Sequence, residues 1–250
     1  MSKLTNKTAF VTGASKGLGA AIAKELAAAG ASVIVNYSSS KASADKVVAD
    51  IVAAGGKAEA IQGDFSNPAD ISRVYAEIKK SHKKLDILVN SAGVYAFGPI
   101  DSVTPQEIHR QFNLNVVGLL LSTKEALPLF GPEGGSIINI GSGVGKQSPA
   151  YGAIYSGTKG AVNSITVSLS KELGPRKIRV NALNPGLIET EGSALDGGLE
   201  NDFAKLVQKT TPLGGIGVPQ DIANVALFLA SDESSWVSGQ EIIVAGGFTM

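Results

Sequence analysis

Cysteine is absent from this 250-residue chain, and histidine occurs only twice, at His82 and His109. Without cysteine the chain can form no disulfide, offers no thiolate nucleophile and cannot hold a metal through sulfur. Two separated histidines do not make a histidine-rich metal site, so we expect no metal centre. Net charge is absent too, because 22 basic residues balance 22 acidic ones. This balance argues against a broad surface for nucleic acid or for an anionic membrane.

Long apolar runs are also missing. No run reaches about 18 residues, the length that suggests a membrane-spanning helix. No signal peptide precedes Lys3, so the sequence predicts a soluble, cytoplasmic protein. The chain is 44% hydrophobic, which is enough for one sizeable core. We expect one domain over residues 1–250, because α/β folds of this length often stay undivided.

Short apolar runs alternate with helical patterns along the whole chain. Runs rich in valine and isoleucine predict buried parallel strands, and repeats of 3–4 residues predict helices between them. The expected strands are 8–12, 31–36, 58–63, 85–90, 136–140, 177–183 and 241–245. The first expected helix ends near residue 30. The others span 43–54, 68–81, 104–130, 152–173 and 219–230. Residues 187–218 are polar, glycine-rich and weakly periodic, which predicts a mobile segment that covers the substrate.

This alternation predicts an α/β fold with a doubly wound parallel sheet of about seven strands and helices on both faces. Ligands of such sheets bind outside the carboxyl ends of the strands. Five marked residues follow predicted strands and should meet at that edge; they are Gly13, Asp64, Asn90, Ser142 and Pro185.

Three glycines, Gly13, Gly17 and Gly19, lie between the first strand and the first helix. Gly13 permits a tight turn, Gly17 lets a diphosphate approach the backbone, and Gly19 lets the helix pack on the strand. The helix N-terminus then offers free N–H groups and a positive dipole end to phosphates. The first gap is one residue longer than in the usual dinucleotide fingerprint. After a first strand in an α/β chain, the loop favours dinucleotide binding over a simple turn.

Tyr155 and Lys159 are separated by one helical turn, so their side chains share a face. A neighbouring ammonium favours the phenolate and should lower the pKa of Tyr155, which makes the phenol a proton donor or acceptor near neutral pH. Ser142, at the end of the preceding strand, could bond the same reacting oxygen. The alternative is an ordinary amphipathic helix with a surface tyrosine and lysine.

An ordered set of motifs resembles the short-chain dehydrogenase/reductase family, of the shorter, so-called classical type. The set is Thr12-Gly-x-x-x-Gly-x-Gly19, Asn90-x-Ala-Gly93, Asn115, Ser142, Tyr155-x-x-x-Lys159 and Pro185-Gly186. The resemblance covers the whole chain and implies a Rossmann-like domain, a nicotinamide cofactor and reversible carbonyl–alcohol hydride transfer. One departure is Ser91, where the family often has asparagine.

By this resemblance, Asn115, Ser142, Tyr155 and Lys159 are the catalytic residues. The implied cofactor contacts are Gly13, Ser15, Lys16, Gly17, Leu18, Gly19, Asn36, Tyr37, Ser38, Ser39, Asp64, Phe65, Asn90, Ala92, Gly93, Tyr155, Lys159, Pro185, Gly186, Ile188 and Thr190. Lys159 would also hold the nicotinamide ribose, and Asn115 would hold a water that links Lys159 to solvent. Asp64 could instead cap the next turn, Asn90 could instead brace its strand, and Asn115 could instead fill a packing defect.

The end of the second strand predicts the choice of nicotinamide. An acidic residue there would bind both ribose hydroxyls and repel a 2′-phosphate, but Asn36-Tyr-Ser-Ser39 contains no carboxylate. Asn36, Ser38 and Ser39 can donate to phosphate oxygens, and Lys16 adds positive charge. The sequence therefore favours NADP(H) over NAD(H).

The substrate wall should come from residues 143–151 and 187–212. Candidate substrate contacts are Ser142, Val144, Gln147, Tyr151, Tyr155, Leu187 and Leu195, although several could be only packing or loop residues. Residues 127–135 contain no lysine or arginine, and Lys171, Arg176 and Lys177 make only a thin basic patch for an acidic carrier protein.

We therefore expect an NADPH-dependent oxidoreductase that reduces a small ketone, ketoester or ketosugar. A 3-oxoacyl-(acyl-carrier-protein) reductase is the alternative within the family, and a non-catalytic NADP(H)-binding sensor is the alternative from another class. The resemblance also implies a homotetramer.

Overall fold

The computed structural model describes residues 2–191 and 202–248. Seven parallel strands form one sheet in the order β3-β2-β1-β4-β5-β6-β7. The strands are β1 (Thr8–Val11), β2 (Ser32–Tyr37), β3 (Lys57–Gln62), β4 (Ile87–Asn90), β5 (Gly135–Ile140), β6 (Ile178–Pro185) and β7 (Glu241–Val244). The order reverses direction between β1 and β4, so the predicted doubly wound α/β fold is confirmed.

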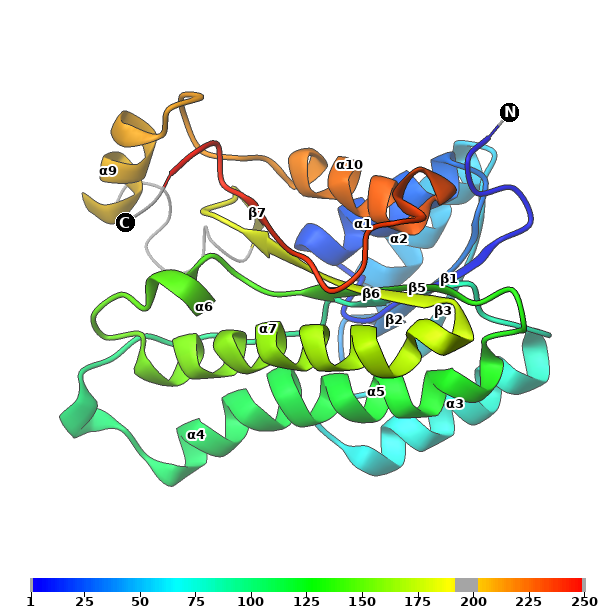
Figure 1. Ribbon diagram of the computed structural model, residues 1–250, viewed down its shortest axis with the longest axis horizontal. Coiled ribbons are helices and arrows are strands. Elements are labelled where there is room, and N and C mark those ends of the chain that lie inside the picture. Colours follow the sequence, from blue (N-terminus) through cyan, green and yellow to red (C-terminus); the bar gives the residue numbers. More distant parts are fainter. Residues whose placement is uncertain (1, 192–201, 249–250) are drawn as a thin grey trace.

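Helices cover both faces of the sheet (Figure 1). One face carries α1 (Gly17–Ala28), α2 (Lys41–Ala53) and α10 (Pro219–Ala230), and the other carries α3 (Pro68–Ser81), α4 (Pro105–Phe112), α5 (Leu119–Ala126) and α7 (Ala153–Leu173). Short α6 (Val144–Gln147) and α9 (Asp202–Thr210) lie beyond one end of the sheet. Single 3₁₀ turns occur at Ile100–Ser102, Leu127–Leu129, Gly174–Arg176 and Asp232–Ser234.

The alternation of side chains along β1 divides the core into two halves. Ala9 and Val11 pack into the cluster formed with α1, α2 and α10, while Phe10 packs into the cluster formed with α3, α5 and α7. All three side chains are fully buried. Because both faces of this central strand are covered, its sequence is a continuous apolar run rather than an alternating one.

The helix predicted over 104–130 is interrupted in its middle. Its beginning is as predicted, since Thr104 accepts a hydrogen bond from the Glu107 N–H and Pro105 is the first helical residue. Residues Asn113–Gly118 then form a π-helical segment before α5 resumes the α-helical pattern. A Cβ on Gly118 would lie 2.2 Å from the carbonyl oxygen of Phe65, so close packing on another loop accompanies this wider turn. Helical periodicity could not reveal the interruption, because it depends on contacts made far away in the chain.

Residues 187–218 contain more regular structure than the sequence indicated. The described residues of this segment include α9 and an isolated parallel pairing of Ile188 with Gly217. The helix α9 buries Ala204 and Val207 on one side and exposes Phe203 and Leu206 on the other. Among the helices of the described ranges, none is long and apolar enough to cross a membrane.

Candidate active site

Tyr155 and Lys159 lie in the first two turns of α7, one above the other, as their spacing predicts. The Lys159 ammonium is 5.7 Å from the centre of the Tyr155 ring, and its Nζ donates a hydrogen bond of 2.8 Å to the carbonyl oxygen of Ile140. Ser142, two residues beyond the end of β5, hydrogen-bonds the Tyr155 side chain. The structure therefore brings the three predicted side chains together at the carboxyl edge of the sheet.

The charge state of this pair differs from the sequence-based expectation. Burial raises the pKa of Tyr155 above its ordinary value, and the hydrogen bond with Ser142 only partly opposes this rise. Burial also lowers the pKa of Lys159 to about 8. The expectation that Lys159 lowers the pKa of Tyr155 is thus wrong for this state of the protein. The reason is that removal from water disfavours both charged forms more than the ammonium favours the phenolate.

Asn115 fixes the loop after β4 against α7 from inside the π-helical segment. Its Oδ1 accepts from the Val94 N–H at 2.9 Å, and its Nδ2 donates to the Val94 carbonyl at 2.8 Å and to Thr158 Oγ1 at 3.1 Å. A Cβ on Gly93 would lie 3.3 Å from Asn115 Oδ1 and 3.7 Å from Lys159 Nζ. Asn115, Gly93 and Lys159 are therefore neighbours, and the side chain of Asn115 is satisfied rather than left at a packing defect.

The glycine loop between β1 and α1 has the geometry of a phosphate cradle. Gly13 and Gly17 have φ angles of +62° and +56°, which favour glycine. A Cβ on Gly13 would lie 2.8 Å from Ala92 Cα, and one on Gly19 would lie 2.6 Å from the Gly13 carbonyl oxygen. No side chain caps the start of α1, and its first turn contains no acidic residue. These features fit a diphosphate at the helix N-terminus.

Asn36 at the end of β2 has a different placement from the one predicted. It is buried, and its Oδ1 accepts from the Gly13 N–H at 3.1 Å while its Nδ2 donates to the Gly63 carbonyl at 3.1 Å. The sequence-based role as a hydrogen-bond donor to a phosphate does not match this geometry, because the amide is used to join the glycine loop to β3. Ser38 and Ser39 are exposed beyond the strand, and Lys16 is exposed in the loop.

Four other predicted cofactor contacts are hydrogen-bonded or packed within the protein. Asp64 Oδ1 accepts from the backbone and hydroxyl of Ser66, so it caps the following turn while remaining exposed. The ring of Phe65 is buried in the core, as is that of Tyr37. Asn90 bonds Ser122, Thr123 and Asn139 side chains and thereby braces β4.

The segment after β6 returns to the glycine loop. A Cβ on Gly17 would lie 3.9 Å from the side chain of Thr190, which brings these two predicted contacts together. Ile188 is buried and pairs with Gly217, and the Pro185 carbonyl accepts from the Gly143 N–H at 2.9 Å. Leu187 is half-buried, and Leu195 lies outside the described residues. Ser15, Ala92 and Gly186 lie in the same loops as the residues above, and Leu18 lies in the first turn of α1.

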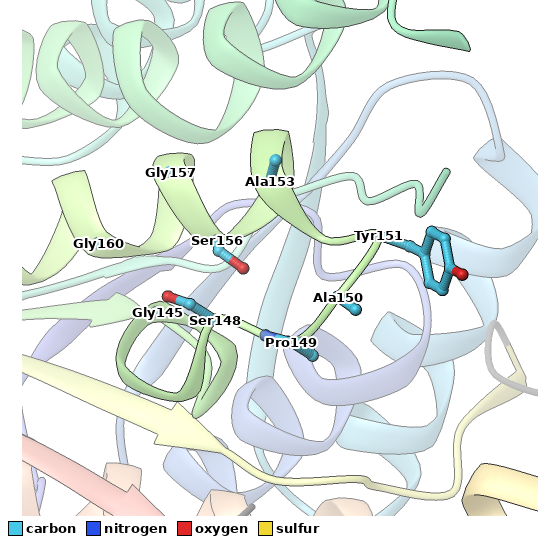
Figure 2. A pocket seen from close by; sticks show the side chains of 9 residues that line it. All are labelled: Gly145, Ser148, Pro149, Ala150, Tyr151, Ala153, Ser156, Gly157 and Gly160. Carbon is cyan, nitrogen blue, oxygen red and sulfur yellow. The ribbon is translucent and has the colours of Figure 1, made fainter. Parts of the chain in front are cut away.

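One pocket in the described part of the chain lies against Ala153, Ser156, Gly157 and Gly160 of α7. It has a volume of about 560 Å³ and is open to solvent between α6 and α7. Figure 2 shows that Tyr151 points away from it while Ser156 points toward it. None of Ser142, Tyr155 and Lys159 lines it. The side chains of the proposed reacting centre therefore lie outside this pocket.

The predicted substrate contacts around α6 have a strained turn beside them. Val144 and Gln147 are half-buried in α6, whereas Tyr151 is exposed and has a φ angle of +64°. Ser148 also has a positive φ, of +47°. Positive φ is uncommon for residues with a side chain, and such positions gather at functional sites.

Sequence reasoning missed two aromatic residues beside Tyr155. The ring centres of Tyr95 and Phe97 lie 5.9 and 5.8 Å from that of Tyr155. They belong to the loop after β4, between Gly93 and Pro99. A signal was present, because two aromatic residues directly follow a glycine motif at the functional edge of the sheet.

Comparisons with known proteins show the family of the chain. A family model described as enoyl-(acyl carrier protein) reductase matches residues 13–249. An uncharacterized oxidoreductase of Methylorubrum extorquens is 51% identical over 247 residues, with 99% of each chain covered. Versicolorin reductase 1 of Aspergillus parasiticus is 39% identical, covering 98% of this chain and 97% of the relative.

A solved structure of a short chain dehydrogenase from Burkholderia cenocepacia in complex with NADP is 34% identical. It has a TM-score of 0.92, and 98% of each chain is covered. The chain belongs to the short-chain dehydrogenase/reductase family, and it is an oxidoreductase with the nicotinamide-binding fold of that family.

Proposed function

We propose that this protein uses NADPH to reduce a small ketone, ketoester or ketosugar to a secondary alcohol, in a reversible reaction. One observation carries the proposal, namely that the Tyr155 side chain is hydrogen-bonded to Ser142 while the Lys159 ammonium lies 5.7 Å from the centre of its ring. The reductase names of relatives such as versicolorin reductase 1 support the direction of the reaction.

The residues present fit a dinucleotide. The uncapped start of α1 would receive the diphosphate, and Gly13 and Gly17 would let it approach the backbone. The other proposed cofactor contacts border the same edge of the sheet and are Asp64, Asn90, Ile188 and Thr190. Lys159 would contact the nicotinamide ribose. When bound, the reduced nicotinamide supplies a hydride to the carbonyl carbon.

Preference for NADPH is part of the proposal. Three exposed residues near the end of β2 can bond a 2′-phosphate, namely Ser38, Ser39 and Lys16. The stretch Asn36-Tyr-Ser-Ser39 contains no carboxylate that would repel this phosphate. The relative solved with NADP supports this choice. The ratio of kcat/KM for NADPH to that for NADH should exceed one and should fall in Lys16→Ala. A ratio below one in the unmodified enzyme contradicts the preference.

Each of the four catalytic side chains has its own role in the reduction. As the carbonyl carbon gains a hydride, negative charge grows on the substrate oxygen, and Ser142 stabilises that charge by donating a hydrogen bond. Tyr155 transfers its proton to the same oxygen, which completes the alcohol and leaves a phenolate. Because the pKa of Tyr155 is raised, the phenol holds this proton at neutral pH until the oxygen accepts it. Lys159 then stabilises the phenolate that remains, and Asn115 keeps the neighbouring loop in place.

A Tyr155→Phe variant tests this assignment. We expect it to lose turnover while it binds NADPH with nearly unchanged affinity, because only the hydroxyl is removed. Turnover is measured by NADPH oxidation with diketones, ketoesters, ketosugars and acetoacetyl thioesters, and binding by NADPH fluorescence. Retention of more than a few per cent of the turnover would remove Tyr155 from its role.

The panel also separates the alternatives. A 3-oxoacyl-(acyl-carrier-protein) reductase would prefer the carrier-bound thioester, an option that the description of the matching family model keeps open. The thin basic patch favours a free substrate, since Arg176 is already bonded to the Leu127 carbonyl at 2.7 Å. A non-catalytic NADP(H) sensor would bind NADPH but oxidise it with none of the compounds.

We also propose a homotetramer. Val117 and Leu120 are exposed on the side of the π-helical segment and α5, and Trp236 is 99% exposed near the end of the chain. Uncovered apolar side chains of this size favour contacts between copies. Light scattering should give four chains per particle, and a monomeric mass would contradict the proposal.

A further inference from the structure

Two aromatic rings contact each other and the ring of Tyr155, the residue proposed as the proton donor. We call Tyr95 and Phe97, together with the ring of Tyr155, the aromatic wall. Their ring centres are 5.8–6.3 Å apart, and their planes are inclined by 52–68° to one another. These values lie in the range of favourable edge-to-face contacts between aromatic rings. The wall therefore extends directly from the proton-donating residue.

The wall is only partly covered by protein. Tyr95 is 43% exposed and Phe97 is 51% exposed, although each touches the other rings. Both rings contact the ring of Tyr155, which distinguishes them from other exposed aromatic residues such as Phe228 and Trp236. Exposed aromatic surface beside a reacting group is typical of a ligand-binding wall, because apolar and aromatic side chains line most small-molecule sites.

The loop that carries the wall is fixed by hydrogen bonds to its backbone. Arg110 Nη2 donates to the Tyr95 carbonyl at 3.2 Å, and Gln111 Nε2 donates to the Ala96 carbonyl at 3.4 Å. Glu107 accepts from both side chains at 2.8 Å and so holds them in position.

The far end of the loop is fixed too. The Gly98 N–H donates to the carbonyl of Tyr151, at the strained turn before α7. A Cβ on Gly152 would lie 3.1 Å from the Phe97 ring, so this ring packs directly on the start of α7. A wall held in this way binds a rigid group without first losing conformational freedom.

We propose that Tyr95 and Phe97 form a subsite for a planar aromatic group attached to the substrate carbonyl, so that the enzyme favours aryl ketones. This inference rests on the proposed reduction and narrows its substrate class. A planar ring can contact both exposed rings while its carbonyl oxygen meets Tyr155 and Ser142. A sugar would instead place hydroxyl groups against aromatic carbon. Arg110 lies beside the wall, but its charge is balanced by its ion pair with Glu107. It therefore does not favour an anionic substrate.

The test compares acetophenone with cyclohexyl methyl ketone. The two probes have the same number of carbon atoms, but only the first has a planar aromatic ring. Because conjugation alters intrinsic reactivity, the readout is the change in the ratio of their kcat/KM values between the unmodified enzyme and its variants. Butane-2,3-dione, which is too small to reach across the wall, serves as the reference substrate.

Phe97→Leu and Tyr95→Leu should each lower the acetophenone-to-cyclohexyl ratio about two- to twelvefold, the range expected for loss of one aromatic pair. Turnover of butane-2,3-dione measures any general loss of activity in these variants, because both rings also contact Tyr155, and the ratio is interpreted apart from that loss. Tyr95→Phe, which keeps the ring, should retain the ratio. Phe228→Leu is the matched control, since Phe228 is 36% exposed on α10 and belongs to neither the wall nor the site.

The outcomes separate this inference from the proposed function. If the unmodified enzyme reduces no carbonyl compound, the proposed function fails. If it reduces the probes but neither leucine variant changes the ratio, the aromatic subsite is overturned while the reductase assignment stands. NADPH binding and thermal unfolding of each variant confirm that a changed ratio does not come from misfolding.

Discussion

The buried ammonium of Lys159 should make the stability of the protein depend on pH in a predictable direction. Lys159 is only 6% exposed, and burial lowers its pKa from an ordinary value of 10.5 to about 8. Between these two pH values the unfolded chain binds the proton and the folded chain does not. The free energy of unfolding therefore rises with pH across this window. Below pH 8 both states are protonated, and the folded state carries the full penalty of the buried charge.

The size of the effect follows from the two pKa values. Each tenfold difference in proton affinity corresponds to about 1.4 kcal/mol, so raising the pH from 7 to 10 should relieve about 2–3 kcal/mol of this penalty. The scan stops at pH 10, because the raised pKa of Tyr155 acts in the opposite direction once tyrosines of the unfolded chain ionise. Comparison with Lys159→Met cancels the titrating groups that are distant from Lys159, since both proteins share them and their effects add.

The assay is urea unfolding of both proteins at several pH values and at one protein concentration. Between pH 7 and pH 10, the unfolding free energy of the unmodified protein should rise by about 2–3 kcal/mol more than that of Lys159→Met. The control is Lys124→Met, which removes a lysine whose side chain is 73% exposed and should give no such change. A difference between the unmodified protein and Lys159→Met that stays constant with pH would refute the argument that Lys159 is desolvated.

Two further predictions concern the loops around the site. Gly13→Ala and Gly17→Ala should both weaken NADPH binding, because both glycines have positive φ and line the approach of the diphosphate; only Gly13→Ala should also lower stability strongly, since its Cβ would lie 2.8 Å from Ala92 Cα whereas that of Gly17 has no protein neighbour nearer than 3.9 Å. Fluorescence titration with NADPH and thermal unfolding measure the two effects, and unchanged NADPH binding in Gly17→Ala would contradict the role of the close approach. Asn115→Ala should lower the unfolding free energy by about 2–4 kcal/mol, because it leaves the half-buried Val94 N–H and carbonyl without their partner. Urea unfolding at neutral pH measures this loss, and a change below about 1 kcal/mol would mean that the loop finds other partners.

Much of the architecture could be predicted because its causes are local. The strands are short apolar runs, and α3 and α10 begin and end where the sequence indicates, since Pro68 and Pro219 mark first helical turns. The parallel order of the strands then follows from the length of the connections. Gly13, Ser142 and Tyr155 could be selected because their positions after strands, or at a helical spacing, are visible in the chain itself.

Other features depend on residues that are distant in the sequence. Asn36 looks like a phosphate donor in isolation, but its amide is used by Gly13 and Gly63. The π-helical turn around Asn115 requires the backbone of Val94, which no periodicity encodes.

The sequence by itself determined the parallel sheet, the glycine loop and the pairing of Tyr155 with Lys159, because apolar runs, glycine positions and helical spacing act over a few residues. Only the tertiary structure decided the direction of the pKa change at Tyr155 and the placement of Phe97 beside it. Both depend on how completely water is excluded where separate segments of the chain meet, and burial of this kind is a property of the folded molecule.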